Sequence, residues 1–172
     1  MEDIVVVDNF LSQQELTNVA SLATYKNEDW GLQRSWGSNA THPLTKIDFN
    51  GTFLTKRLDD NEYYTSYLFN KIKNHFNYNY KLIEVYLNGN EALRNGSFHI
   101  DDADRTVILY IGDWEPAWGG FTHFMLSDID HRIVAPITGR MINFRSDIPH
   151  KAYAYCYSDC PMRVSAAFKL KL

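Results

Sequence analysis

The chain has 172 residues, of which 45% are hydrophobic and 15% aromatic, and its formal net charge is −4. This length fits one domain, which we expect to span residues 1–172. No apolar run approaches the roughly 20 residues of a membrane-spanning helix. The acidic balance argues against a protein whose affinity comes from neutralising nucleic-acid phosphates.

The cysteine count and the first residues indicate a reducing setting. Two cysteines, Cys156 and Cys160, are too few for a disulfide framework. The first residues are acidic and pass directly into a β-branched run, so they lack the basic start and apolar stretch of a signal peptide. We therefore expect a cytoplasmic protein.

The first half of the chain is predicted to hold one strand and two helices. Residues 4–7 form a β-branched run that is typical of a strand. The run Ser12-Gln13-Gln14-Glu15 matches a capping box, so we expect a helix over residues 12–25. A second helix is predicted over residues 60–76, where large apolar side chains recur every fourth position. The polar and aromatic stretch 27–55 indicates a long loop, of a kind that is usually functional or mobile.

After Asn79 the pattern changes to short strands. Turn residues such as Asn88-Gly89-Asn90 and Thr138-Gly139 separate them. The eight predicted strands cover residues 80–87, 97–101, 105–111, 121–126, 131–135, 140–144, 152–157 and 163–170. Two helices followed by eight strands predict a mostly β protein, a double-sheet jelly roll with both helices packed on one outer face.

The most informative motif is His99-Ile100-Asp101, followed forty-nine residues after Asp101 by His150. Two histidines and one carboxylate are the protein ligands of a catalytic non-haem Fe(II) site. On a strand, His99 and Asp101 would point to the same face, and an antiparallel partner strand can bring His150 beside them. Three ligands on one face leave three octahedral positions open, whereas a closed four-ligand site would be structural.

Around this motif the chain resembles the 2-oxoglutarate/Fe(II)-dependent oxygenases, and within them the prolyl 4-hydroxylase branch. The resemblance covers nearly all of the chain. It rests on residues 7–12, on the His-x-Asp within 98–101, on Trp118-Gly119-Gly120-Phe121-Thr122, on the proline and glycine turn within 136–144, and on 146–150 ending in the distal histidine. It implies a double-stranded β-helix fold and Fe(II) held by His99, Asp101 and His150. It also implies 2-oxoglutarate and O2 as co-substrates, with ascorbate as an accessory reductant.

Three further residues are implied to hold 2-oxoglutarate. Arg163 lies thirteen residues after His150, where the family keeps the basic residue for the 5-carboxylate. A buried carboxylate needs a partner, and Arg163 can donate two parallel charge-assisted hydrogen bonds to it. Tyr110 matches the family tyrosine that adds a phenolic hydrogen bond, and Tyr86 falls at a family tyrosine near the co-substrate.

The resemblance implies hydroxylation of a C–H bond, with a prolyl residue of a peptide or protein as the leading substrate and succinate and CO2 as products. Prolyl hydroxylases usually carry a tyrosine three residues before the first metal histidine, where this chain has Gly96. Another protein side chain, a free amino acid or a small metabolite is therefore an open alternative. The acidic balance weighs against oxidative demethylation of nucleic acid. A non-catalytic metal-binding jelly roll is the alternative from a different class.

Two residues are candidates for contact with the substrate. Trp36 lies in the long loop beside Arg34 and is a candidate for a lid over the substrate. Arg145 is the second candidate. His123 follows the Gly-Gly turn, but we expect it to be solvated or to lie outside the ligand set.

Overall fold

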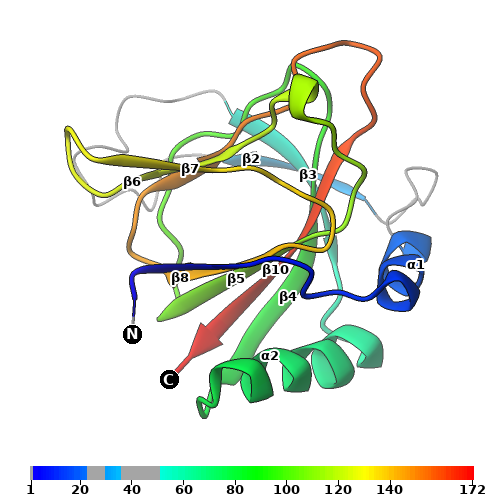
Figure 1. Ribbon diagram of the computed structural model, residues 1–172, viewed down its shortest axis with the longest axis vertical. Coiled ribbons are helices and arrows are strands. Elements are labelled where there is room, and N and C mark those ends of the chain that lie inside the picture. Colours follow the sequence, from blue (N-terminus) through cyan, green and yellow to red (C-terminus); the bar gives the residue numbers. More distant parts are fainter. Residues whose placement is uncertain (1, 23–29, 36–50) are drawn as a thin grey trace.

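The computed structural model describes residues 2–22, 30–35 and 51–172. Its strands form a seven-stranded sheet and a three-stranded sheet. Figure 1 shows the two sheets facing each other, with both helices on the outer side of the larger one. This arrangement confirms the predicted jelly roll with helices on one face.

The elements follow the chain in this order: β1 Ile4–Val7, α1 Gln13–Leu22, β2 Gly31–Ser35, β3 Gly51–Arg57, the π-helical turn η3 Tyr63–Leu68, α2 Phe69–Phe76, β4 Lys81–Asn90, β5 Arg105–Tyr110, the 3₁₀ turn η4 Pro116–Trp118, β6 Thr122–Met125, β7 His131–Val134, β8 Met141–Arg145, β9 His150–Ala152 and β10 Arg163–Lys171. The strand order is β1-β8-β5-β10-β4-β3-β2 in the larger sheet and β7-β6-β9 in the smaller one. Every pairing between neighbouring strands is antiparallel among these described elements. Hairpins and longer returns therefore connect the strands without a parallel crossover.

The first helix begins at the predicted capping box, and the second ends at the predicted residue 76. The Ser12 N–H donates to Glu15 Oε2 at 2.7 Å and the Glu15 N–H donates to Ser12 Oγ at 3.4 Å, which confirms the capping box. Residues 23–25 of the predicted first helix lie outside the described part of the chain. The second helix is continuous from η3 through α2 and ends at Asn77, whose φ of 53° is left-handed. No helix among the described residues is long and apolar enough to span a membrane.

The two faces of the central strands have different surroundings: one packs in the apolar core under the helices, and the other faces the small sheet. On β5 and β10, one set of alternate residues, such as Val107 and Phe168, packs under the helices. The other set on β5, Ile108 and Tyr110, points toward the small sheet. Because side chains alternate along a strand, the same inner face of β10 carries Arg163, Ser165, Ala167 and Lys169. Polar residues in an otherwise apolar strand therefore line the space between the sheets.

Two sequence predictions were wrong, one about the segment between the two helices and one about the segment between the second helix and the metal motif. The stretch 27–55 contains β2 and the start of β3, which pair antiparallel, so it is not one long loop. Asn88-Gly89-Asn90 is no turn either, because these residues continue β4 and pair with Ser165, Val164 and Arg163 of β10. The glycine there serves close packing, since a Cβ on Gly89 would lie 2.6 Å from Met162 Sδ.

Two of the predicted strands are also much shorter in the structure. In 97–101, the described pairing is a single bridge between His99 and His150. Of the predicted strand 152–157, only Ala152 belongs to a strand, as the last residue of β9. Beyond it, the Ala154 N–H donates a hydrogen bond to the side-chain oxygen Asn95 Oδ1 at 2.9 Å and not to a neighbouring strand. Side-chain bonds of this kind compete with ladder bonds. The Gly139 turn, with φ of 81°, is confirmed.

Candidate metal and co-substrate site

The three predicted metal ligands converge. His99 and His150 sit opposite each other in the isolated bridge, and the Asp101 N–H donates to Ser146 O at 2.9 Å, which turns the carboxylate toward both rings. One potential ligand atom from each of the three lies within 4.8 Å of the others. Asp101 Oδ2 is 3.4 Å from His150 Nε2, and Asp101 Oδ1 is 3.7 Å from His99 Nε2. These distances allow the three side chains to share one ion.

Backbone carbonyls fix which nitrogen of each histidine is free. His99 Nδ1 lies 2.9 Å from Ser97 O, and His150 Nδ1 lies 2.9 Å from Ile148 O. A carbonyl oxygen only accepts, so each Nδ1 carries the proton and each Nε2 keeps its lone pair for a metal. Burial lowers the pKa of His150 to about 3, so this ring is neutral at physiological pH.

The Asp101 carboxylate is buried and held by two side chains that sequence reasoning missed. Its Oδ2 accepts a hydrogen bond from Thr106 Oγ1 at 2.6 Å and forms an ion pair with Lys169 Nζ. Burial by itself raises the pKa of Asp101, but the Lys169 ammonium and the neighbouring histidines outweigh it, and the pKa lies well below its ordinary value. A signal for Lys169 existed in the sequence, because it is a lysine at an inward position of an apolar strand.

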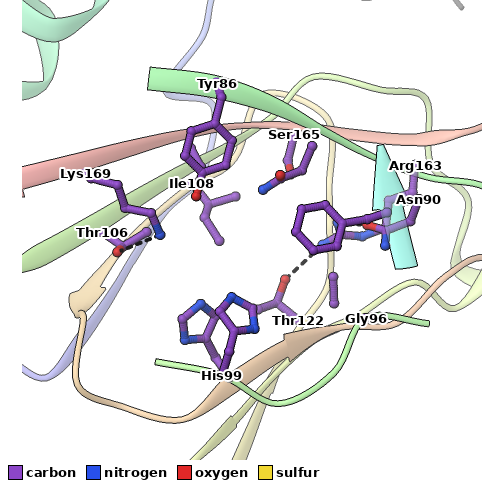
Figure 2. A pocket seen from close by; sticks show the side chains of 15 residues that line it. Tyr86, Asn90, Gly96, His99, Thr106, Ile108, Thr122, Arg163, Ser165 and Lys169 are labelled. Atoms are coloured by element: carbon purple, nitrogen blue, oxygen red, sulfur yellow. Dashed lines mark hydrogen bonds between the residues drawn. The ribbon is translucent and has the colours of Figure 1, made fainter. Parts of the chain in front are cut away.

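Arg163 lies at the other end of the inner face and is 2% exposed. Its Nε donates to Gly120 O at 2.7 Å and its Nη1 to Asn90 Oδ1 at 3.4 Å. Its Nη2 donates to Thr122 Oγ1 at 2.9 Å (Figure 2). All three partners are neutral, and no carboxylate pairs with this guanidinium among the residues that the structure describes. A buried charge without a counter-charge is costly, so the site is suited to an anion.

The two predicted tyrosines lie apart, Tyr110 beside Arg163 and Tyr86 beside Lys169. The Tyr110 hydroxyl is 2.6 Å from Thr122 Oγ1, and its ring centroid is 5.3 Å from Arg163 Cζ. Tyr86 lines the pocket wall instead near Lys169, whose Nζ is 5.7 Å from the centroid of the tyrosine ring. Burial raises the pKa of both phenols, so both are protonated donors at neutral pH.

A pocket of about 560 Å³, including its open mouth, joins the metal ligands to Arg163. Figure 2 shows His99 on one wall, with Arg163 and Lys169 at opposite ends of the other. Side chains lining it include Phe53, Tyr86, Asn90, Ile108, Thr122, Ala152, Ser165 and Ala167. A neighbouring groove shares Phe53 and Tyr86 with this pocket and is further lined by Thr55, Arg57 and Glu84. The groove therefore meets the pocket at β3 and β4.

Solved structures of other proteins share this fold. No protein-family model matches the sequence, and no curated protein matches it. The structure is similar to a 2OG-Fe(II) oxygenase family oxidoreductase from Burkholderia pseudomallei, with a TM-score of 0.71 and 13% identity over 98% of this chain and 84% of that one. It is also similar to a prolyl hydroxylase from Trichoplax adhaerens in complex with a hypoxia-inducible factor peptide, with a TM-score of 0.70 and 18% identity over 98% and 83%. The chain has the fold of the 2-oxoglutarate/Fe(II)-dependent oxygenases.

This oxygenase fold is not confined to prolyl hydroxylases. A third similar structure is the epimerase SnoN from nogalamycin biosynthesis, in complex with Fe3+, alpha-ketoglutarate and nogalamycin RO. In that complex its TM-score is 0.65, with 14% identity over 98% of this chain and 78% of that one. The predicted resemblance to the superfamily and to its prolyl hydroxylase branch is thus confirmed as a resemblance of fold.

The two residues predicted to contact the substrate are not found at the pocket among the residues that the structure describes. Trp36 is outside the described residues. Arg145 ends β8 with an exposed side chain, whose Nη2 is 2.5 Å from Asp147 Oδ2, and the structure does not bring it to the pocket. His123 is no part of the triad, because its Nε2 bonds to His131 Nδ1 at 2.7 Å.

Proposed function

We propose that the protein is an Fe(II)- and 2-oxoglutarate-dependent dioxygenase that hydroxylates a C–H bond and releases succinate and CO2. One observation carries the proposal: the pocket has a facial His-Asp-His set at one end and a buried guanidinium without a carboxylate partner, among the described residues, at the other. A keto-diacid suits both ends. Its 5-carboxylate would pair with Arg163, while its 2-oxo and 1-carboxylate groups are those that chelate a metal.

The donor set fits Fe(II). Two imidazole nitrogens and one carboxylate oxygen on one face are the ligands typical of non-haem Fe(II) oxygenases. His99, Asp101 and His150 would hold the ion. When bound, the iron supplies the oxidation of 2-oxoglutarate and of the substrate by O2, which is chemistry the side chains cannot perform.

The residues of the chain position the reactants and keep water out. Arg163 would orient the co-substrate from its far end, because its guanidinium is itself fixed by Gly120, Thr122 and Asn90. The 5-carboxylate would also lie near the Tyr110 hydroxyl, which bonds to the same threonine. Apolar side chains on the inner strands, Ile108 and Ala167, make this part of the pocket dry.

For the substrate we propose a prolyl residue of a peptide or protein. Support comes from the similar prolyl hydroxylase that was solved with a peptide, and from the groove along β3 and β4, which shares Phe53 and Tyr86 with the pocket. A small molecule is the second candidate, favoured by the fold similarity to SnoN and by Gly96 in the pocket wall. The net charge of −4 weighs against nucleic acid.

Anaerobic spectroscopy tests the oxygenase proposal. Addition of Fe(II) and 2-oxoglutarate should produce a weak visible charge-transfer band that the variant His150→Ala lacks. On admission of O2, the wild-type protein should form succinate in an iron-dependent manner. Bound iron without such a band would indicate a non-catalytic metal-binding jelly roll.

A second experiment separates the substrates. Proline-containing peptides, free amino acids and methylated oligonucleotides would be offered to the iron-loaded protein, and mass spectrometry would detect a gain of one oxygen or the loss of a methyl group. Oxygen gained by the peptides alone supports the prolyl proposal. Succinate formation with no product from any of the three moves the assignment to a small metabolite.

A further inference from the structure

We propose that Lys169 is a positioning residue that, together with Thr106, restricts Asp101 to binding the metal through a single oxygen, Oδ1. This inference rests on the proposed metal site and adds a residue to it. Neither the sequence motif nor the fold similarity assigns a role to this lysine.

The first observation is the location of the lysine. Lys169 lies on the inner face of β10 (Figure 2). Its side chain is 6% exposed, and its Nζ is ion-paired with Asp101 Oδ2. Its neighbours on the strand, Phe168 and Leu170, belong to the apolar core under the helices. Burial of an ammonium group costs several kcal/mol unless it is paired and hydrogen-bonded. The ammonium is here paired with the buried Asp101 carboxylate, so the lysine is explained by that carboxylate and not by packing.

The second observation is that both donors reach the same oxygen. Thr106 Oγ1 is 2.6 Å from Asp101 Oδ2, and Lys169 Nζ is 3.4 Å from that threonine hydroxyl. Thr106 is in turn 2.9 Å from Ser146 Oγ, so the hydroxyl belongs to a buried network. The other oxygen, Oδ1, accepts no hydrogen bond from the described residues and faces His99 Nε2 at 3.7 Å. The carboxylate therefore has one occupied oxygen and one oxygen available to an ion.

This asymmetry affects the number of coordination positions. A carboxylate can bind a metal through one oxygen or through both. With one oxygen from Asp101 and one nitrogen from each histidine, three of six octahedral positions stay open, whereas two-oxygen binding would leave two. A keto-acid chelate takes two positions, so only one-oxygen binding leaves a position for a further ligand. Lys169 and Thr106 thus preserve the position that an oxygenase requires.

A competing role for the lysine is also physically reasonable. Lys169 is a cation close to the metal site, and like charges repel. If it only neutralised Asp101 in the metal-free protein, it would compete with the metal, and its removal would strengthen metal binding. The two roles predict changes of opposite sign.

Titration of the 172-residue protein with Co(II), which can replace Fe(II) without reacting rapidly with O2, distinguishes these roles. The d–d absorption of Co(II) reports both the affinity and the coordination geometry. We expect Lys169→Met to lower Co(II) affinity by about 10–100-fold, the usual effect of losing a residue that orients a ligand, and to change the d–d spectrum. Lys171→Met is the matched control, because Lys171 ends the same strand with an exposed side chain, and it should behave as wild type.

The outcomes separate this inference from the proposed function. If wild type and His99→Ala bind Co(II) equally, the ligand set itself is wrong. If His99→Ala loses Co(II) while Lys169→Met binds it as tightly as wild type or more tightly, with an unchanged spectrum, the positioning role is overturned and the ligand set stands. Should Lys169→Met fail to fold, Thr106→Val removes the other donor to Oδ2. It must then weaken Co(II) binding and alter the spectrum, and unchanged binding would overturn the role.

Discussion

His99 and His150 are hydrogen-bonded to each other through their backbones, the N–H of each donating to the carbonyl oxygen of the other at 3.0 and 2.9 Å. Their ring centroids lie 4.4 Å apart. A reciprocal pair of this kind is the unit of an antiparallel ladder, although no regular strand carries His99. The main chain therefore fixes two ligands that are distant in sequence.

Because the backbone holds this pair, removal of one ring should affect the metal more than the fold. The His99 side chain is 34% exposed, so we expect His99→Ala to cost little stability. Mn(II) at one hundred times its dissociation constant should stabilise the wild-type protein by about 2.7 kcal/mol, and this gain should vanish in the variant. Thermal unfolding with and without Mn(II) measures it.

The control is His131→Ala, which removes an exposed imidazole outside the triad. It should keep the full metal-dependent rise in unfolding temperature. A comparable rise in His99→Ala would refute the ligand assignment.

Arg163→Lys keeps the positive charge and removes the fork of donors. The lysine cannot reproduce two parallel hydrogen bonds, and the loss of one charge-assisted bond costs about 1.5–3 kcal/mol, or roughly 10–100-fold in 2-oxoglutarate affinity. Fe(II) binding should change little, because Arg163 is no ligand. Titration of the anaerobic charge-transfer band with 2-oxoglutarate gives the affinity. Arg145→Lys, at an exposed arginine away from the pocket, should leave it unchanged. Weakened iron with normal 2-oxoglutarate affinity would contradict the role.

The parts of the site that could be predicted are those with residue types specific to their chemistry. His99, Asp101 and His150 form an order of ligands that few other functions require, and the structure brings them together. Arg163 was predictable because a guanidinium among small and apolar neighbours needs a buried anion. The jelly roll was predictable from the change of period after the second helix.

The parts that could not be predicted depend on pairing between distant segments. Asn88-Gly89-Asn90 has the composition of a turn, but packing against Met162 and pairing with β10 override the local preference. Thr106 is an ordinary strand residue until register places its hydroxyl against Asp101. Likewise, Lys169 acquires its partner only through the order of strands in the larger sheet.

The Gly119-Gly120 turn holds the carbonyl oxygen that accepts a hydrogen bond from Arg163 Nε, and its two glycines offer a matched pair of variants. Both glycines have positive φ, at 70° and 74°, so alanine is strained at either position. A Cβ on Gly119 would have no atom within 4 Å, whereas a Cβ on Gly120 would lie 2.5 Å from Tyr155 Cδ1. We expect Gly119→Ala to cost about 1–2 kcal/mol of unfolding free energy and Gly120→Ala to cost clearly more. Urea denaturation gives both values. Equal costs would mean that the tyrosine ring moves aside freely.

Acid should weaken the attachment of α1 to the second helix through Glu15. Burial raises the pKa of Glu15, but Lys71, Ser12 and Tyr67 bond to its carboxylate, and the net effect lowers this pKa from its ordinary value of 4.5 to about 2. A group with a lowered native pKa stabilises the fold fully above its unfolded-state pKa. This stability is lost as pH falls from about 4.5 toward 2. Because the side chain of its partner Lys71 is 33% exposed, solvent screens the ion pair, and we expect on the order of 1 kcal/mol at neutral pH.

Glu15→Gln isolates this contribution, since glutamine keeps the size of the side chain and loses the charge that Lys71 contacts. Urea denaturation of both proteins at a series of pH values would give their unfolding free energies. The difference in unfolding free energy between wild type and variant should be largest at pH 6–7. It should shrink between about pH 4.5 and 2, where the Glu15 carboxylate of the wild type gains a proton and becomes as uncharged as the glutamine. A difference that stays constant down to pH 2 would show that the ion pair adds nothing and that shape alone decides the cost of the substitution.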